Sequence, residues 1–344
     1  MSGDLWHTYT GEHLPNTIDV DWLWHKRMPA GHVNFLGATG GAGKSLLGMA
    51  LGLCVGAGIP FLDAETQPGT VLYYDFEADA NAIGHMLHKV RRGLGLTPAA
   101  VGSRFVYRSP SAQGSPVLDG ERLESIAAEV RAGGVQLVII DAWTSAFWNV
   151  RSNSTEEVAA KMADLRMLAA TGAAVLIIDH TPKPIANGPN AVDRGIIGST
   201  MKLAGARAGY MLVRVPPKEV DGRDVLALHC LKNNLGPIED PIGIERSWIE
   251  DAVTFQVTDL PEAAAGAPGR MRAQAAIREA LDGGDSVARR DLVRIVNQRA
   301  NVQNRTVEAA IARLIAANVV ESLPHPSDGR ARVYRLADAE STSA

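Results

Sequence analysis

The sequence predicts an α/β fold in which a mostly parallel central sheet is flanked by helices, with a small C-terminal helical domain. Two observations support this prediction. Residues 32–51 pass from an apolar segment through a glycine-rich turn into an apolar helical segment. Further apolar runs then alternate with helical patterns, as is typical of strands buried on both faces of a parallel sheet. These runs are residues 71–74, 105–107, 137–140 and 174–178.

The segments between and after these runs predict the remaining elements of the large domain. Helices are expected at residues 123–132 and 155–170, the second opening with Ser154 and two acidic residues that suit a helix start. Residues 210–215 and 225–230 are expected to form adjacent antiparallel strands.

The C-terminal region predicts three helices followed by a hairpin. The helices are expected at residues 270–281, 289–299 and 304–316, and the hairpin strands at 319–323 and 332–336. This order resembles a winged helix, with its third helix as the possible DNA-recognition element. A role in protein interaction or oligomerisation stays open, because the architecture does not fix the partner. The side chains that this helix and the wing would present are Gln303, Asn304, Arg305, Glu308, Arg330 and Arg332.

The composition and the order of the predicted elements divide the chain into five parts. We expect an N-terminal segment at residues 1–30, the nucleotide-binding domain at 31–258 and a linker rich in alanine, glycine and proline at 259–269. The winged-helix domain is expected at 270–338, followed by a flexible tail at 339–344.

The distribution of charge and the number of cysteines limit the kinds of protein that this chain can be. The 344 residues carry a net charge of −4, yet residues 270–338 hold twelve arginines, no lysine and eight acidic residues, a local charge of +4. This asymmetry hints at nucleic acid near the C-terminal end. The two cysteines, Cys54 and Cys230, suggest neither a disulfide framework nor a zinc site. We see no membrane-spanning run or signal peptide and expect a cytoplasmic protein.

The glycine-rich turn predicts a phosphate-binding loop. Residues 38–45 read Ala-Thr-Gly-Gly-Ala-Gly-Lys-Ser, and Ala38 stands where the strict pattern has glycine. Lys44 would lie between the β- and γ-phosphates of ATP, and Ser45 would bind Mg²⁺. Backbone N–H groups and the helix N-terminus would contribute the remaining phosphate contacts. The expected nucleotide-binding residues are Thr39, Gly40, Gly41, Ala42, Gly43, Lys44, Ser45 and Leu46.

Three strand ends supply candidate catalytic groups, because the carboxyl ends of parallel strands meet at one edge of the sheet. Asp141 follows an apolar strand and is the expected carboxylate on the Mg²⁺ side. Glu77 is the expected base that deprotonates water, with Asp75 and Asp79 as competitors. His180 would sense the γ-phosphate and report its loss to the loop that follows, although a structural histidine is the plainer alternative.

Together these motifs resemble those of RecA-like ATPases, and most closely the RepA-type hexameric replicative helicases of plasmids and phages, often catalogued as AAA-family ATPases. The resemblance covers about residues 15–258 and rests on the order and spacing of the motifs. Besides the residues above it includes Arg194–Ser199, which read Arg-Gly-Ile-Ile-Gly-Ser, and Gly205-Ala206-Arg207.

The resemblance implies a ring, usually a hexamer, in which one subunit completes the ATP site of its neighbour. The family's arginine finger falls at Arg207, and Lys232 is a second basic candidate. An arginine supplied in this way stabilises the charge of the transferring phosphoryl group. A surface salt bridge is the alternative for Arg207. The winged helix is not part of the minimal RepA-like ATPase.

Two segments would face the centre of such a ring and contact single-stranded DNA, residues 142–154 and 181–194. Single-strand binders combine basic groups with stacking aromatic rings. The first segment contains Trp143, Phe147, Trp148 and Arg151, whose rings could equally pack as core; the second contains Lys183, Asn187, Asn190 and Arg194. A replicative helicase or translocase is the leading hypothesis. An ATP-switched replication initiator or regulator that uses the winged helix, and a filament-forming recombination mediator, are the alternatives.

Overall fold

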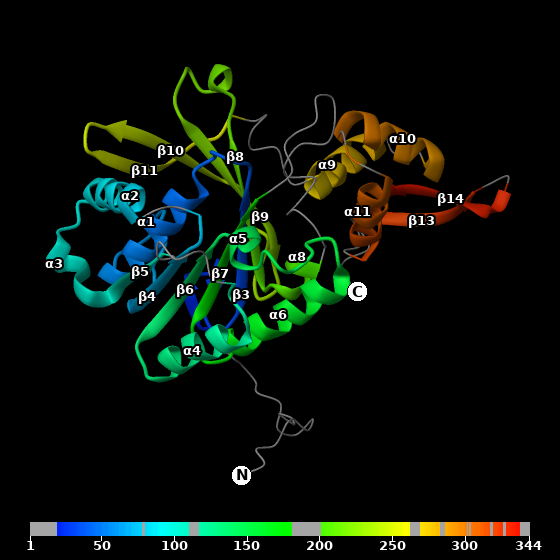
Figure 1. Ribbon diagram of the computed structural model, residues 1–344. Coiled ribbons are helices and arrows are strands. Elements are labelled where there is room, and N and C mark those ends of the chain that lie inside the picture. The colour runs from blue at the N-terminus through cyan, green and yellow to red at the C-terminus, as the bar shows by residue number, and fades with distance from the viewer. Residues whose placement is uncertain are drawn as a thin grey trace, which may run out of the picture.

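The computed structural model describes residues 19–77, 80–109, 117–180, 201–261, 269–282, 286–300, 302, 304–316, 319–325 and 328–337. Within these ranges the main sheet has nine strands in the order β11-β10-β9-β8-β3-β7-β6-β4-β5 (Figure 1). The strands from β8 to β5 run parallel, and β9, β10 and β11 extend the sheet in antiparallel pairs. The predicted mostly parallel sheet is therefore confirmed.

The strands of this sheet agree closely with the apolar runs of the sequence. They are β3 (Val33–Ala38), β4 (Thr70–Asp75), β5 (Phe105–Arg108), β6 (Val135–Asp141), β7 (Ala174–His180), β8 (Ala208–Arg214), β9 (Val225–Asn233), β10 (Ile242–Ile249) and β11 (Ala252–Thr258). The antiparallel pairing of β8 with β9 is as predicted. A separate pair, β1 (Trp22–Trp24) and β2 (Met28–Pro29), precedes β3.

Helices cover both faces of the sheet, which explains why its central strands are apolar throughout. On β6, Leu137 and Ile139 pack with α1 and α2, whereas Val138 and Ile140 pack with α4 and α6. Successive strand residues point to opposite faces, so both sets must be apolar. The helices of this part are α1 (Lys44–Ala57), α2 (Ala80–Gly93), α3 (Pro98–Val101), α4 (Gly120–Arg131), α5 (Trp143–Ala146), α6 (Thr155–Ala169) and α8 (Met201–Gly205), with short 3₁₀ turns at Gly102–Arg104 and Pro217–Glu219.

The hairpin of β10 and β11 was not predicted from the sequence. It packs on α2, where Gly93 lies so close to the backbone of Val253 that any side chain at position 93 would overlap it. His88 of α2 also lies 2.8 Å from Asp251 in the turn of the hairpin. The hairpin therefore fastens the antiparallel end of the sheet to the helix that follows β4.

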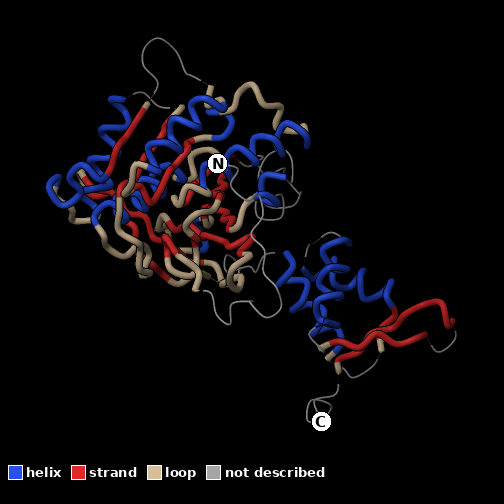
Figure 2. The backbone as a smooth tube through the Cα atoms, turned by 90° about the horizontal axis from the view of Figure 1, so that it is seen from below, coloured by secondary structure: helices blue, strands red, loops and turns tan. Residues whose placement is uncertain are grey.

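The C-terminal elements occur in the predicted order and lie apart from the main sheet (Figure 2). Ile277, Leu292 and Val307, one from each helix, belong to a hydrophobic cluster of their own. Three short strands form a second sheet in the order β12-β14-β13. The elements are α9 (Gly269–Leu281), β12 (Val287–Ala288), α10 (Arg289–Ala300), α11 (Asn304–Ala316), β13 (Val320–His325) and β14 (Asp328–Leu336).

The structure also bears on the two sequence expectations about the cysteines and about membrane-spanning segments. Both Cys54 and Cys230 are buried free thiols. In the ranges that the structure describes, the helices are too short or too polar to traverse a lipid bilayer.

Candidate functional site

The phosphate-binding loop joins β3 to α1 as predicted. Gly41 and Gly43 have φ angles of 76° and 101°, a left-handed backbone that favours glycine. Lys44 is the first residue of α1 and is only 6% exposed. The N-terminus of this 14-residue helix thus lies directly behind the loop, where its partial positive charge favours phosphate. Residues 39–46 therefore form one continuous candidate site for a triphosphate.

Neighbouring parallel strands bring the other predicted residues to the same edge of the sheet. The order β3-β7-β6-β4 places the phosphate loop, His180, Asp141 and the end of β4 side by side. In register, Ala38 pairs with His180, and Asp75 pairs with Asp141. The strand ends thus assemble the site without any long connection.

Asp141 is a buried carboxylate whose ionisation is tuned by its surroundings. It is 2% exposed, and the Tyr73 hydroxyl donates a 2.6 Å hydrogen bond to its Oδ2 atom. Burial raises the pKa of Asp141 to about 6, and hydrogen bonding by Tyr73 and by the nearby Ser45 hydroxyl opposes this shift. The negative charge of Asp75 adds to the rise in pKa, and the positive charge of Lys44 counters it.

The residues around Asp141 fit a Mg²⁺ ion. Its Oδ1 atom is buried and accepts no hydrogen bond from the described residues, which leaves an oxygen for a metal-bound water. The described residues contain no cluster of three or more His, Cys, Asp or Glu side chains that could bind a metal alone. Mg²⁺ binds to few protein oxygens and keeps waters and phosphates as its other ligands, so a hydroxyl and a carboxylate group are enough to hold it. Ser45 and Asp141 are therefore the residues that would hold it.

Glu77 lies just beyond β4 and interacts with two groups of the site. Its Oε1 atom is 3.0 Å from Nε2 of His180 and accepts a 3.2 Å hydrogen bond from the Ser145 hydroxyl. Its backbone N–H donates to Asp75 Oδ1 at 2.8 Å, so Asp75 shapes the turn. Asp75 is 3% exposed, whereas the Glu77 side chain is 35% exposed and accessible to water. Of the three candidate bases, Glu77 is thus the accessible one within the described residues; Asp79 lies outside them.

A buried ion pair supports His180. The backbone N–H of His180 donates to Asp179 Oδ1, and Lys202 donates to Asp179 Oδ2, each at 2.8 Å. Both side chains of the pair are 0% exposed, and Lys202 Nζ lies 4.7 Å from the centre of the Trp143 ring. Burial raises the pKa of Asp179 and lowers that of Lys202, while their mutual attraction opposes both shifts. The pair therefore fixes the backbone at His180 against α5, which contains Ser145.

Arg207 and Lys232 lie at the opposite edge of the sheet from the phosphate loop. The backbone N–H of Arg207 donates to Val33 at the start of β3, roughly 16 Å of strand before Ala38. Lys232 lies beside it in the β8–β9 register, and its ammonium donates to two carbonyl groups at the end of α8. Neither residue can reach the phosphate loop of its own chain. Lys232 is thus not part of the chain's own nucleotide site.

For the aromatic rings of residues 142–154, the structure decides between the two alternatives of core packing and base stacking. Trp143 and Phe147 are 0% and 1% exposed and pack in the core, so they are not available for stacking on bases. Trp148 is 65% exposed, and Arg151 is paired with Glu157. The second expected DNA segment, residues 181–194, and the motif at 194–199 lie outside the described residues.

Sequence reasoning missed four residues that contact this site: Tyr73, Ser145, Lys202 and Arg246. Only Ser145, four residues after Asp141, had a signal in its position. Arg246 comes from β10, far along the chain, and its guanidinium donates to the Ala42 carbonyl in the phosphate loop.

Comparison with known proteins agrees with this geometry. Residues 13–186 match the AAA_25 family, described as an AAA domain. The match spans just over half of the chain and includes the phosphate loop, Glu77, Asp141 and His180. A comparison with curated proteins found no match. A P-loop NTPase domain of this kind implies ATP binding, typically with Mg²⁺, and ATP hydrolysis. The chain belongs to the AAA_25 family of RecA-like P-loop NTPases.

Proposed function

We propose that the chain is an ATP-driven motor acting on DNA, a ring-forming replicative helicase or translocase of the RepA type, assembled as a hexamer. The placement of Arg207 is the observation that supports this proposal. An exposed arginine at the far edge of the sheet cannot serve its own site, but it can complete the site of a neighbouring copy.

Each residue of the site then has a chemical role. Lys44 and the loop N–H groups bind the triphosphate, and the Mg²⁺ held by Ser45 and Asp141 supplies charge neutralisation at the phosphates. Glu77 accepts the proton of the attacking water. His180 leaves Glu77 for the γ-phosphate and returns when it is lost, which transmits the state of the nucleotide to the chain after β7.

Single-stranded DNA is expected to stimulate ATP hydrolysis, with Trp148 as one of the stacking rings. Trp148→Ala should raise the DNA concentration for half-maximal stimulation at least about fivefold, because stacking on one base is worth about 1–3 kcal/mol. The measurement is the ATPase rate without nucleic acid, with single strands and with duplex. Met167→Ala, which removes another exposed apolar side chain, should leave the stimulation unchanged. Activity indifferent to DNA would contradict the motor hypothesis.

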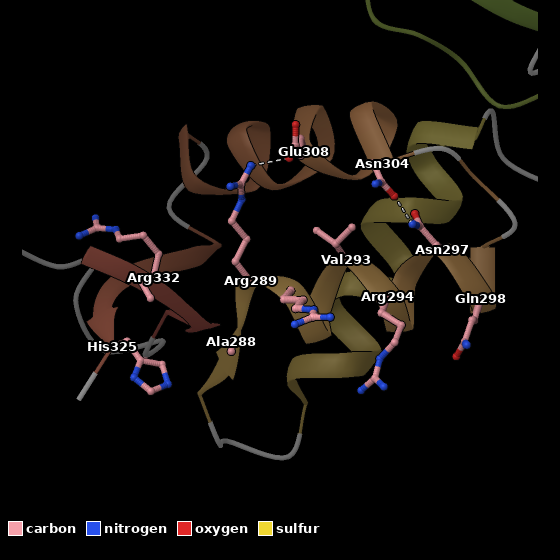
Figure 3. Close-up of a pocket in the computed structure, with 12 residues that line it drawn as sticks. Ala288, Arg289, Val293, Arg294, Asn297, Gln298, Asn304, Glu308, His325 and Arg332 are labelled. Carbon is pink, nitrogen blue, oxygen red and sulfur yellow. Dashed lines mark hydrogen bonds and ion pairs between the residues drawn. The ribbon is translucent and has the colours of Figure 1, made fainter. Parts of the chain in front are cut away.

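A second candidate function is an ATP-switched DNA-binding regulator. It is favoured by a basic concave surface on the C-terminal elements, which we interpret as a winged helix (Figure 3). The surface lies between α10, the start of α11 and the β13–β14 hairpin, and Glu308 is the one acidic side chain among its described lining residues. Its basic side chains are Arg289, Arg290, Arg294, His325 and Arg332. Sequence-specific duplex binding by the full chain, with no ATPase stimulation by single strands, would favour this function.

The pKa of Asp141 predicts competition between protons and Mg²⁺. Because the pKa is raised to about 6 in the ligand-free protein, the carboxylate is ionised at pH 7.5 and is mostly protonated at pH 5. The Mg²⁺ concentration for half-maximal hydrolysis should therefore rise about tenfold between these pH values. Tyr73→Phe removes a hydrogen bond that favours the charged form, so the rise should begin at higher pH. The protonation of ATP itself is the same in assays of the unaltered chain and of Tyr73→Phe. If the half-maximal Mg²⁺ concentration depends on pH identically for the two proteins, the prediction is contradicted.

A further inference from the structure

Arg246 is a buried arginine that touches the phosphate loop from outside. It lies in β10 and is 6% exposed. Its Nη1 atom donates to the Ala42 carbonyl at 3.3 Å, and the same guanidinium lies against Gly43, where a Cβ atom would overlap it. Glycine at position 43 thus serves both the left-handed backbone and the close approach of this arginine.

The other side of the guanidinium is tied to the antiparallel strands. Its Nε and Nη2 atoms lie 2.8 and 2.7 Å from Oδ2 of Asp224, just before β9. Arg214 at the end of β8 lies 3.0 Å from the other oxygen of Asp224. Arg246, itself in β10, therefore connects the phosphate loop to the end of β8 and the start of β9, and all three strands lie beyond residues 13–186.

A phosphate loop needs such a support for a physical reason. Its N–H groups must converge on the phosphates, so carbonyl groups turn outward and need donors of their own when buried. A fixed charged donor satisfies such a carbonyl, and hydrogen bonds to charged groups are stronger than neutral ones. It also orders the loop before the ligand arrives, which lowers the entropic cost of binding.

We infer that Arg246 is a positioning residue that holds the phosphate loop in its triphosphate-accepting conformation, anchored by Asp224. It acts through the backbone of residues 42–43. This role does not require the chain to bind DNA, so it is independent of the proposed motor function. The ligand class that it affects is any Mg²⁺-bound polyphosphate, because the loop reads phosphates and not the base.

Binding assays on the full chain test this role. Arg246→Ala should weaken the binding of both MgADP and inorganic tripolyphosphate by at least about tenfold and raise the KM for ATP similarly. The kcat at saturating ATP should change less than the KM, since Arg246 does not touch the reacting atoms. Arg246→Lys retains the charge but cannot bond the carbonyl and Asp224 together, so it should recover only part of the affinity.

A neighbouring ion pair between β10 and the chain just before β9 provides the matched control. Glu245, the neighbour of Arg246 in β10, pairs with Arg223 at 2.8 Å. Among the described residues, neither of these two side chains contacts the phosphate loop. Arg223→Ala should therefore leave polyphosphate affinity unchanged. If folded Arg246→Ala protein binds tripolyphosphate as tightly as the unaltered chain, the inference is overturned. If that variant does not fold, Arg246→Lys decides: normal affinity for both ligands overturns the inference, and a several-fold loss for both supports it.

Discussion

Replacing Glu77 with glutamine is expected to lower the rate of ATP hydrolysis by about 100-fold or more, while MgATP binding stays close to normal. An amide keeps the size of the side chain and can still accept the hydrogen bond from Ser145. It cannot take the proton of an attacking water, which the carboxylate, 35% exposed beside His180, is placed to do. Binding is unaffected because Lys44 and the loop N–H groups contact the phosphates without Glu77.

Two measurements separate these effects: phosphate release gives the rate, and a fluorescent ATP analogue gives the affinity. The control is Glu121→Gln, which removes an exposed carboxylate from the first turn of α4 and should change neither quantity. A rate within about twofold of normal for Glu77→Gln would assign the proton transfer to another carboxylate, Asp75 or Asp79.

The placement of the candidate residues at one edge of the sheet could be predicted from the sequence because parallel strands leave little choice. Once β3, β4, β6 and β7 are recognised as buried strands of one sheet, Glu77, Asp141 and His180 must lie at its carboxyl edge. The distances between them follow from strand spacing and register. The structure places Arg207 at the other edge by the same rule, since it directly precedes β8, which runs parallel to β3.

Side-chain burial outside the strands could not be predicted in this way. Trp143 begins a four-residue helix and Phe147 follows its last residue, and a pattern this brief does not reveal a buried face. The sequence therefore left core packing and base stacking equally open for these two rings. Lys202 could not be singled out from the sequence, because its partner Asp179 lies 23 positions earlier and only the folded chain brings them together. A buried charge of this kind is tolerated only with such a partner.

The β10–β11 hairpin escaped prediction for a related reason. Its first strand reads Ile-Gly-Ile-Glu-Arg-Ser-Trp-Ile, in which the inward position of Arg246 breaks the alternation expected of a half-buried strand. The arginine faces the phosphate loop, so the departure from the pattern marks a functional contact. When one polar residue interrupts the apolar face of a strand, the contacts of that residue can reveal a functional role.

Arg207→Ala is expected to reduce ATP hydrolysis by about 1,000-fold or more without weakening nucleotide binding, if the arginine acts on a neighbouring site. The fall should be this large because the guanidinium would stabilise charge that develops only as the phosphoryl group is transferred. Binding should persist because the arginine lies at the edge of the sheet opposite its own phosphate loop. Arg131→Ala, which removes an exposed arginine from the end of α4, is the control and should have no effect.

Mixing two inactive variants distinguishes a neighbour's arginine from a structural one. Lys44→Ala protein lacks a working phosphate loop but keeps Arg207, and Arg207→Ala protein has the reverse defect. In a mixed ring, some interfaces pair the intact loop of one variant with the intact arginine of the other, so activity should partly return on mixing.

No recovery, with mixed assembly verified by light scattering or cross-linking, would mean that Arg207 acts only within its own chain. Because roughly 16 Å of strand separate it from Ala38, such an effect would have to pass through the fold. The beginning of β8 and the end of β9 lie at Arg207 and Lys232, and their opposite ends lie at Arg214 and Asp224, next to Arg246. An Arg207→Ala variant that also binds tripolyphosphate weakly would then indicate that these strands, and not an arginine finger, connect Arg207 to the phosphate loop.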